Sequence, residues 1–463
     1  MIFSSQVFIF YFLPVVLGVY FLLPCRKNMK ARNLWLAAAS IFFYAWWDWR
    51  MLPFLAAAVF VCHRAGRYIY DGGKYRKSML AMAVVITCGT LAVCKYLPAA
   101  AEFFAPLAGT SVPLWVEKIF LPLGISFYTF QALSYTFDAF AGKSEPVGKA
   151  SFTDFFTGTA MFPQLAAGPI VRWSQLAPQL AWRKHTWNCA GEGALLFMLG
   201  LGKKVLIADT LGTIADPVFE QNCPAAAAAW LGIIAYTLQI YFDFSAYCDM
   251  GTGIGRIMGF RLPRNFRSPY RQFSVSGFWK HWHITLTAWL RDYIYIPLGG
   301  SRKGMFRTLI NIYAVMIICG IWHGAGWNFI LFGLLHGTAM AAERLTAGRI
   351  RFPAWAGWIW MMFIVICGFV LFRTTDPAGA VNFFLALAGK GNTGCGYLLN
   401  SICTPAAFVI LAAGAVTAVC RITSRAMAVR CTLTDCLWAT AIFAASLLKM
   451  AGGVPREFIY FIF

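Results

Sequence analysis

Apolar runs long enough to cross a lipid bilayer recur along this chain. The hydrocarbon core of a membrane takes about 20 helical residues to span. Runs of about that length lie at residues 5–24, 78–98, 119–141, 190–214, 225–247, 354–374, 404–421 and 433–451. Because these runs are continuous and do not alternate apolar with polar residues, they predict helices and exclude a membrane β-barrel. We expect an all-α polytopic integral membrane protein with about 10–12 transmembrane helices.

Three further apolar stretches are too short to cross a membrane alone. Residues 33–45 and 51–62 flank a Trp-rich turn at 46–50, and the stretch 152–167 contains Pro163. Non-helical backbone at membrane depth is tolerated only where protein covers it or a polar cavity hydrates it. These stretches therefore predict short re-entrant or interfacial helices around an internal cavity.

The composition indicates one environment for the whole chain. Hydrophobic residues make up 60% and charged residues 12% of the sequence, and the mean hydropathy is +0.64. The sequence contains no recognisable soluble domain, linker or internal repeat. Its fourteen cysteines lie mostly in apolar runs without CxxC or Cys/His spacing, so we expect them to pack as small hydrophobic side chains. We expect one membrane domain over residues 1–463.

Positive charge predicts the orientation of the chain. The sequence has 39 Lys and Arg against 18 Asp and Glu, a net charge of +21, and basic loops face the cytoplasm. The clearest basic segments are 26–32, 64–77 and 261–307, whereas the acidic residues within 209–220 are expected in an external loop. Topology alone explains most of this charge, so nucleic-acid binding is not needed.

A further basic cluster at 343–351 constrains the run before it. If this cluster and the segment 261–307 both face the cytoplasm, the run 308–342 must return to its starting side. Otherwise one of the two clusters lies outside.

The basic segment from 261 to 307 is also rich in aromatic residues, which is typical of a membrane interface. Its basic residues are Arg261, Arg264, Arg267, Arg271, Lys280, Arg291, Arg302, Lys303 and Arg307, and its one acid is Asp292. One interpretation is an interfacial anchor bound to anionic lipid. The other is a basic mouth that attracts an anionic ligand, such as a phosphate-bearing nucleotide carrier. In that second interpretation Lys280, Arg291, Arg302 and Lys303 are the candidate ligand-binding residues.

Histidines are the candidate chemical groups of this region. On a helix His281 and His283 point about 200° apart, so only one can face a given cavity, and we favour His283. His323 lies in the middle of the apolar run 308–342, where an ionisable residue marks a functional site by default. His336 follows 13 residues later, on the same face only if the helix is unbroken.

A buried histidine has chemistry suited to acyl transfer. Burial disfavours the charged imidazole, so the neutral ring is available as a base near pH 7. It can take the proton of a hydroxyl that attacks a thioester, while Trp or Asn N–H groups stabilise the oxyanion. The spacings match no standard metal site, so we expect no metal. A serine-hydrolase elbow is absent, because the Gly124–Tyr128 stretch lacks its second glycine.

Several ordered motifs of this chain resemble the membrane-bound O-acyltransferase family, in particular its bacterial branch with the alginate and peptidoglycan O-acetyltransferase membrane components. The most specific motifs are Phe278 to Leu286 (FWKHWHITL), Trp289 to Gly300 (WLRDYIYIPLGG), Trp322 to Gly324 (WHG) and Leu335 to Gly337 (LHG). Weaker matches are Pro122 to Tyr128, Gln131 to Asp138, Pro163 to Ile170 and Asp243 to Tyr247. The resemblance covers most of the chain.

The resemblance implies a fold, a site and a reaction. The family fold places helices around a central catalytic tunnel, in which His323 would be the candidate base and His283 its companion. Residues 261–342 would form the catalytic core segment, with possible support from His336, Trp322, Asn328 and Asp292. The family often has Arg where this chain has His281, which leaves two candidates for the companion histidine.

By the same resemblance the donor is acetyl-CoA, which would dock on the basic cytoplasmic face. The acetyl group would cross a bacterial cytoplasmic membrane to a periplasmic or surface-anchored acyltransferase with a Ser-His-Asp site. That partner would acetylate hydroxyls of an envelope polysaccharide, either peptidoglycan or an alginate-like polymer. One alternative within the family is transfer of D-alanine from a carrier protein to teichoic acid. A transporter with polar residues lining its path is a third interpretation.

Overall fold

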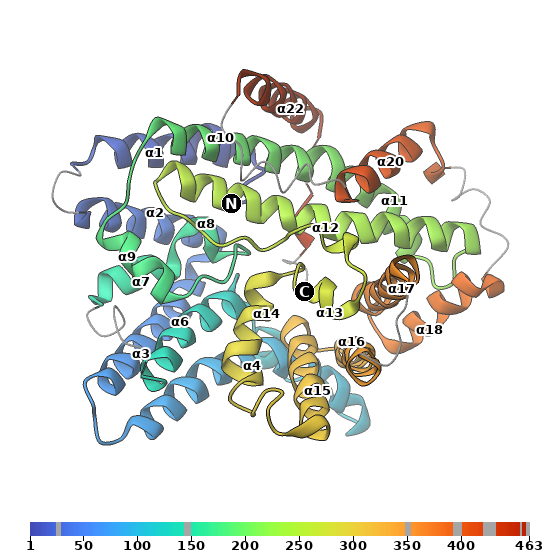
Figure 1. Ribbon diagram of the computed structural model, residues 1–463, viewed down its shortest axis with the longest axis horizontal. Helices are drawn as coiled ribbons and strands as arrows, with labels where there is room; N and C mark the ends of the chain where they lie inside the picture. The colour runs from blue at the N-terminus through green and yellow to red at the C-terminus, as the bar shows by residue number, and fades with distance from the viewer. Residues whose placement is uncertain are drawn as a thin grey trace. The chain divides into compact units, whose positions relative to one another are not determined.

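The structure is a computed structural model that describes residues 1–24, 29–142, 150–347, 353–391, 401–419, 432–453 and 456–459. Every regular element in these ranges is a helix, as Figure 1 shows. Five of the described helices are long and apolar enough to cross a membrane: α4 (Arg76–Leu107), α12 (Ala226–Ile257), α15 (Gly304–His323), α17 (Ala354–Arg373) and α22 (Leu433–Ala451). The expected all-α polytopic architecture is confirmed.

The helices belong to two compact units. The first comprises Met1–Phe197 and Cys248–Pro263, and the second Met198–Tyr247 and Arg264–Phe463. The other helices of the first unit are η1 (Phe8–Phe12), α1 (Leu13–Leu22), α2 (Lys30–Asp48), η2 (Trp49–Met51), α3 (Leu52–Tyr70), α5 (Leu114–Glu117), α6 (Ile125–Phe140), α7 (Phe152–Ala160), α8 (Phe162–Leu165) and α9 (Trp173–Ala181). Helices α10 (Trp187–Gly202) and α12 contribute residues to both units. A single functional domain over residues 1–463 stays a prediction.

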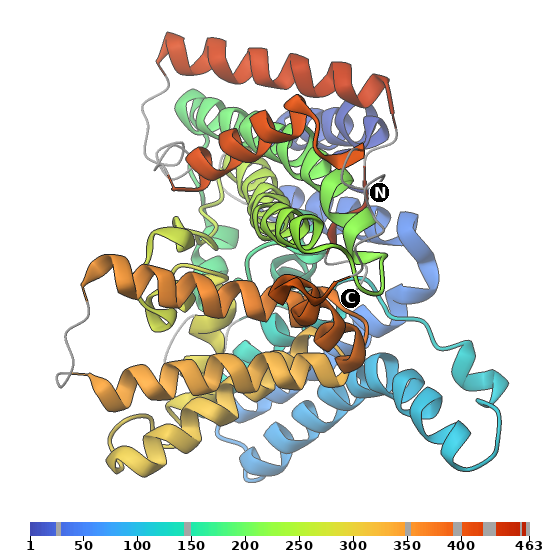
Figure 2. The same cartoon turned by 90° about the vertical axis from the view of Figure 1, so that its right-hand side faces the viewer.

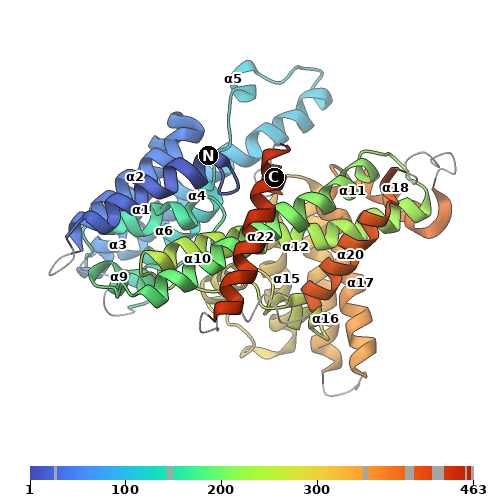
Figure 3. The same ribbon diagram turned by 90° about the horizontal axis from the view of Figure 1, so that it is seen from above.

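The second unit contains the histidine motifs. Its other helices are η4 (Lys203–Ala208), α11 (Asp209–Phe219), η5 (Pro269–Arg271), α13 (Val275–Trp279), α14 (Ile284–Leu290), η6 (Arg291–Tyr295), α16 (Trp327–Thr346), α18 (Pro377–Leu385), η7 (Ala386–Lys390) and α20 (Pro405–Val419). Within this unit α16 packs against both α15 and α17, and the three labels lie close together in Figure 3.

The short apolar stretches form longer helices than their apolar residues suggest. Helices α2 and α3 each have 19 residues. Helix α2 ends at Asp48, where the backbone is extended (φ −159°), and η2 lies between it and α3. The stretch 152–167 does break, at Met161 between α7 and α8. The break predicted there is confirmed. The other two stretches continue through polar residues, of which Asn33 and His63 are buried and Arg64 is exposed.

Two buried arginines donate hydrogen bonds to carbonyl groups at helix C-termini in the first unit. Arg32 lies in the first turn of α2 and donates to the carbonyl oxygen of Leu23 at the end of α1. Arg183 donates to the carbonyl oxygens of Gln179 in α9 and Met258 after α12. The C-terminus of a helix carries partial negative charge, so three helix ends compensate two buried guanidinium groups. Arg32 therefore belongs to the interior, not to a basic loop.

A Gly-rich break folds α15 back onto α16. A Cβ at Gly320 would collide with the carbonyl of Phe329, and one at Gly333 with that of Met316. These pairs run in opposite directions along the chain, so the two helices are antiparallel, and Figure 2 shows them side by side. The start of α15 and the end of α16 thus lie at the same end of the hairpin. The run 308–342 therefore returns to its starting side. This return is what the sequence requires if the basic segments 261–307 and 343–351 both face the cytoplasm.

Asp209 and Asp216 lie within helix α11, and Glu220 follows its last residue, so the expectation of a loop is wrong for the two aspartates. Asp209 is buried, and its carboxylate lies 2.8 Å from the ammonium group of Lys204. The same ammonium group lies 2.8 Å from the carboxylate of Asp243 in α12. Two carboxylates share one buried cation, which explains how acids can lie within a helix that sequence charge alone assigns to a loop.

Candidate active site

His283 lies in a tight turn between α13 and α14. Its backbone is left-handed (φ 44°, ψ 50°), and its side chain is fully buried at 0% exposure. Among the described residues Ser268 is the other non-glycine residue with positive φ. The comparison of directions for His281 and His283 assumed that both lie on one helix. The structure shows that they do not. Left-handed backbone in a residue with a bulky side chain is costly and concentrates at functional sites.

The side chain of Asn265 holds this turn. Its Oδ1 accepts hydrogen bonds from the backbone N–H of Thr285 (3.2 Å) and from the hydroxyl of the same residue (2.9 Å). The Nδ1 atom of His283 lies 3.3 Å from the same oxygen. Asn265 is a candidate site residue that sequence reasoning missed, because it precedes His283 by eighteen residues and lies outside the histidine motif. The sequence signal for it is an uncharged amide side chain within a basic segment.

His323 closes the other side of the site. It is the last residue of α15 and is 5% exposed. The centres of the His283 and His323 rings are 6.4 Å apart, and Trp322 packs against both, at 5.8 Å and 4.9 Å. The structure therefore brings together the two histidines predicted from the WH and WHG motifs.

His336 occupies a neighbouring but distinct position. The break between α15 and α16 removes the unbroken helix on which a shared face with His323 depended. The indole N–H of Trp279 donates to Nδ1 of His336 (3.2 Å), and Phe332 packs against its ring at 4.6 Å. A Cβ at Gly368 would lie 2.6 Å from the Nε2 atom. His336 is thus enclosed by packing on α13 and α17, which favours a structural role.

The amide of Asn328 is engaged elsewhere. Its Nδ2 donates to the carbonyl oxygen of Thr374 (2.9 Å) and to the hydroxyl of the same residue (3.0 Å). These bonds tie the first turn of α16 to the end of α17. Asn328 therefore does not present its N–H groups to a reacting oxygen in this structure, whereas the ring of Trp322, the other predicted donor, packs against both histidines.

The charged candidates lie on the surface of the basic segment. Arg291 and Asp292 form an ion pair with each other (Nε to Oδ1, 2.6 Å). Lys280, Arg302 and Lys303 are exposed. Cations on a surface that an anion can reach suit the electrostatic attraction of phosphate groups, whereas Asp292 neutralises its neighbour.

Other polar contacts support the loops around the site. The carboxylate of Glu343 accepts the backbone N–H groups of Val275 (2.5 Å) and Ser276 (2.9 Å) at the start of α13. Asn311 donates to the carbonyl oxygen of Gly300 (2.9 Å) after η6. His281 contacts the carbonyl oxygen of Gly277 through Nδ1 (2.9 Å) and is half-buried. His281 thus closes its own turn, whereas His283 packs toward His323.

Burial governs the electrostatics of His283, which lies outside the five candidate membrane-spanning helices. Desolvation lowers the pKa of its imidazole to about 3. The ring is therefore neutral at physiological pH and retains one basic nitrogen.

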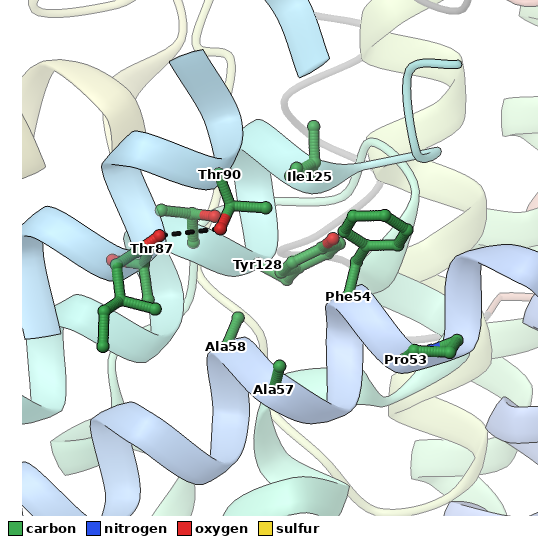
Figure 4. Close-up of a pocket in the computed structure, with 10 residues that line it drawn as sticks. Pro53, Phe54, Ala57, Ala58, Thr87, Thr90, Ile125 and Tyr128 are labelled. Atoms are coloured by element: carbon green, nitrogen blue, oxygen red, sulfur yellow. Dashed lines mark hydrogen bonds between the residues drawn. The ribbon is translucent and has the colours of Figure 1, made fainter. Parts of the chain in front are cut away.

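A separate cavity of about 260 Å³ lies within the first unit, between α3, α4 and α6. Figure 4 shows its lining, in which Thr90 directs its hydroxyl to the carbonyl of Ile86 (2.7 Å). The Thr87 hydroxyl is similarly bonded to Ala83 (2.7 Å). None of the predicted site residues lines this cavity.

Comparison with known proteins identifies the class. The membrane-bound O-acyltransferase family matches residues 39–375, which include His283 and His323, and the chain belongs to this family. It is 40% identical over 401 residues to the probable alginate O-acetylase AlgI of Azotobacter vinelandii, covering 85% of this chain and 79% of that protein. The peptidoglycan O-acetyltransferase of Helicobacter pylori is 33% identical over 428 residues, covering 84% and 80%. The teichoic acid D-alanyltransferase of Bacillus subtilis is 27% identical over 236 residues, covering 47% and 58%.

These comparisons confirm the family resemblance. The protein is a multi-pass membrane O-acyltransferase, and its relatives include acetyltransferases of alginate and peptidoglycan.

Proposed function

We propose that this protein takes acetyl groups from cytoplasmic acetyl-CoA and passes them across a bacterial cytoplasmic membrane for esterification of an envelope polysaccharide. The observation that carries the proposal is the pair of buried histidine rings, 6.4 Å apart, within the segment that matches the acyltransferase family. Residues 261–342 form the proposed catalytic core.

The chemistry needs one base and one oxyanion donor. A neutral imidazole of the His283 and His323 pair removes the proton of the acceptor hydroxyl as its oxygen attacks the thioester carbon. The C–O bond forms and the C–S bond breaks through a tetrahedral oxyanion, which we propose the Trp322 indole N–H stabilises. The protonated imidazole then returns its proton to the leaving thiolate of coenzyme A. Atoms and charge balance without a metal ion.

The donor is proposed to approach from the basic segment. Lys280, Arg302 and Lys303 are exposed there and would attract the phosphates of coenzyme A. Arg291 is a weaker candidate, because Asp292 already pairs with its guanidinium. The acceptor of the acetyl group is proposed to be a separate periplasmic acyltransferase with a Ser-His-Asp site, which modifies peptidoglycan or an alginate-like polymer.

The experiment compares envelope glycans from cells that carry the parent chain, His323→Ala or His283→Ala at equal membrane abundance. Mass spectrometry of acetyl ester on each purified glycan is the readout. We expect loss of ester from one glycan with either substitution, and this glycan is then the acceptor. Unchanged ester on every glycan would contradict the proposal.

Transfer of D-alanine is a second candidate, supported by the partial match to a teichoic acid D-alanyltransferase. The same glycan samples distinguish the two, because a D-alanyl ester and an acetyl ester differ in mass. Loss of D-alanyl ester alone would show that the donor is a carrier-bound D-alanyl group and not acetyl-CoA.

A further inference from the structure

We propose that Asn265 is a positioning residue for the transfer reaction, which fixes the hydrogen of His283 on Nδ1 and thereby directs the basic lone pair of His283 to Nε2. This inference rests on the proposed function and names the residue that would prepare its base. Asn265 lies outside the motifs that identify the family in the sequence.

The identity of the contacting atom follows from its other partner. The backbone N–H of Thr285 can only donate, and it points at Oδ1 of Asn265 from 3.2 Å. Rotating the amide would place an N–H group against this N–H, so the atom at that position is the oxygen. An oxygen that faces Nδ1 of His283 at 3.3 Å requires a hydrogen on that nitrogen. In a neutral imidazole the other nitrogen, Nε2, is then the acceptor.

The backbone of Asn265 holds the same turn from a second direction. Its carbonyl oxygen accepts the N–H of Ile284 (2.9 Å), the residue after His283. Two residues further along the same segment, the N–H of Arg267 donates to the carbonyl oxygen of His281 (3.0 Å). The left-handed conformation of His283 is thus bounded by hydrogen bonds on both sides. A side chain fixed in this way loses little freedom when it reacts.

The side chains around His283 are apolar, so the position of its ring hydrogen depends on few polar partners. The rings of Phe244 (4.8 Å), Phe266 (6.5 Å) and Trp322 (5.8 Å) enclose the imidazole, and His323 is the titratable group among its ring contacts in the described part of the chain. In so apolar a setting, a hydrogen on the wrong nitrogen would not be corrected by solvent. Metal-free catalytic histidines and metal ligands alike depend on an outer partner that fixes the tautomer.

Two substitutions at Asn265 test the inference. Asn265→Leu removes the acceptor, and Asn265→Asp keeps an acceptor oxygen but adds a negative charge beside Nδ1. Thr287→Val is the matched control, because it removes a hydroxyl of the same helix α14 that bonds to the carbonyl oxygen of Trp282 (3.5 Å) and keeps the backbone N–H that Thr287 donates to the carbonyl oxygen of His283 (3.0 Å). The assay follows turnover of radiolabelled acetyl-CoA in inside-out vesicles from pH 5 to pH 8, at equal amounts of folded protein.

We expect kcat to fall about 10- to 100-fold in Asn265→Leu with an unchanged KM for acetyl-CoA. In Asn265→Asp the carboxylate stabilises the imidazolium form and raises the pKa of His283, so activity declines toward pH 5 while the parent and Thr287→Val stay flat. A purely structural Asn265 would lower the abundance of Asn265→Leu but would leave its kcat per folded molecule at the parental value. Asn265→Leu with parental kcat, or Asn265→Asp with a parental pH profile, would overturn the inference.

A His283→Ala variant separates this inference from the proposed function. If His283→Ala is inactive while both Asn265 variants behave as the parent, Asn265 has no positioning role and the proposed function stands. If His283→Ala retains parental turnover, the proposed role of His283 fails, and with it the role of Asn265.

Discussion

Trp279 donates its indole N–H to Nδ1 of His336 across 3.2 Å, and this bond joins α13 to α16 at the back of the histidine site. The acceptor nitrogen is buried, since His336 is 1% exposed. A buried polar atom that loses its partner is more costly than the bond itself is stabilising. This relationship assigns His336 to the support of α13, next to the turn that carries His283.

The first prediction therefore concerns Trp279→Phe, which keeps an aromatic ring but removes the donor. The substitution should lower the free energy of unfolding by about 1–3 kcal/mol, because Nδ1 of His336 is left without its donor. Turnover per folded molecule should stay within about 3-fold of the parent, since a bond of this kind supports the fold and not the reaction. Thermal unfolding in detergent and vesicle turnover are the two measurements. Unchanged stability with lost turnover would instead place His336 in the chemistry.

The second prediction concerns the buried cation of Lys204. Lys204→Met leaves the carboxylates of Asp209 and Asp243 without their shared cation. Removing one partner from a buried ionic group destabilises by about 3–5 kcal/mol, because the remaining charge is uncompensated. The triple variant Lys204→Met, Asp209→Asn, Asp243→Asn removes all three charges and should recover most of the membrane abundance. If Lys204→Met is as stable as the parent, water solvates the carboxylates of Asp209 and Asp243 and the prediction is wrong.

The third prediction concerns pH and His185, which lies between α9 and α10 outside the candidate spans. Burial, followed by the nearby Arg32 and Arg183 charges, lowers its pKa to about 4. The unfolded chain, with an ordinary histidine pKa of about 6.5, binds more protons than the folded chain between these two values. Stability contributed by neutral His185 is therefore complete above about pH 6.5 and falls as the pH drops toward 4.

The matching measurement is the unfolding temperature of the parent and of His185→Gln at pH 7 and pH 5. Among the described residues, the Tyr20 hydroxyl lies 2.8 Å from Nε2 of His185, and Nη1 of Arg32 lies 3.3 Å from the same nitrogen. From pH 7 to pH 5 the unfolding temperature of the parent should fall further than that of His185→Gln. Equal losses would show that His185 titrates normally in the folded protein.

The fourth prediction concerns the exposed cations Arg302 and Lys303. Replacing both with Gln should raise the KM for acetyl-CoA roughly 3- to 10-fold and leave kcat unchanged, because attraction of the donor phosphates weakens while the histidine pair is untouched. The effect should shrink at high salt, since ions screen exposed charges. The matched control replaces two exposed lysines of the first unit, Lys74 and Lys77. Equal KM values for the two double variants would remove these residues from donor binding.

Sequence predicted the spans best where apolar residues are continuous. The run 354–374 corresponds to α17 (Ala354–Arg373), and the run 433–451 has the bounds of α22. Burial in lipid is a local requirement of each residue, so hydropathy reveals such helices directly. Helix α2 begins with polar residues such as Arg32 and Asn33, which the fold buries through tertiary hydrogen bonds. Hydropathy cannot anticipate bonds made to residues far away in the chain.

Candidate site residues could be proposed from the sequence, but their geometry could not. His283 and His323 could be proposed because ionisable groups at membrane depth are rare and because their motifs resemble a family. The left-handed turn at His283 is hydrogen-bonded to Asn265, and no local pattern predicts a positive φ at a non-glycine residue. The amide of Asn328 looked available in the sequence, but Thr374, close in space and far in sequence, accepts both of its hydrogen bonds.

The central claim is that the His283 and His323 pair performs acyl transfer from acetyl-CoA, and isotope transfer tests it most directly. Inside-out vesicles that contain the parent chain, His283→Ala or His323→Ala are supplied with radiolabelled acetyl-CoA, and label is counted in acetyl ester recovered from the lumen. We predict luminal ester with the parent chain and a loss of at least about 100-fold with either substitution, as expected when a general base is removed. Equal luminal label from all three chains would contradict the account.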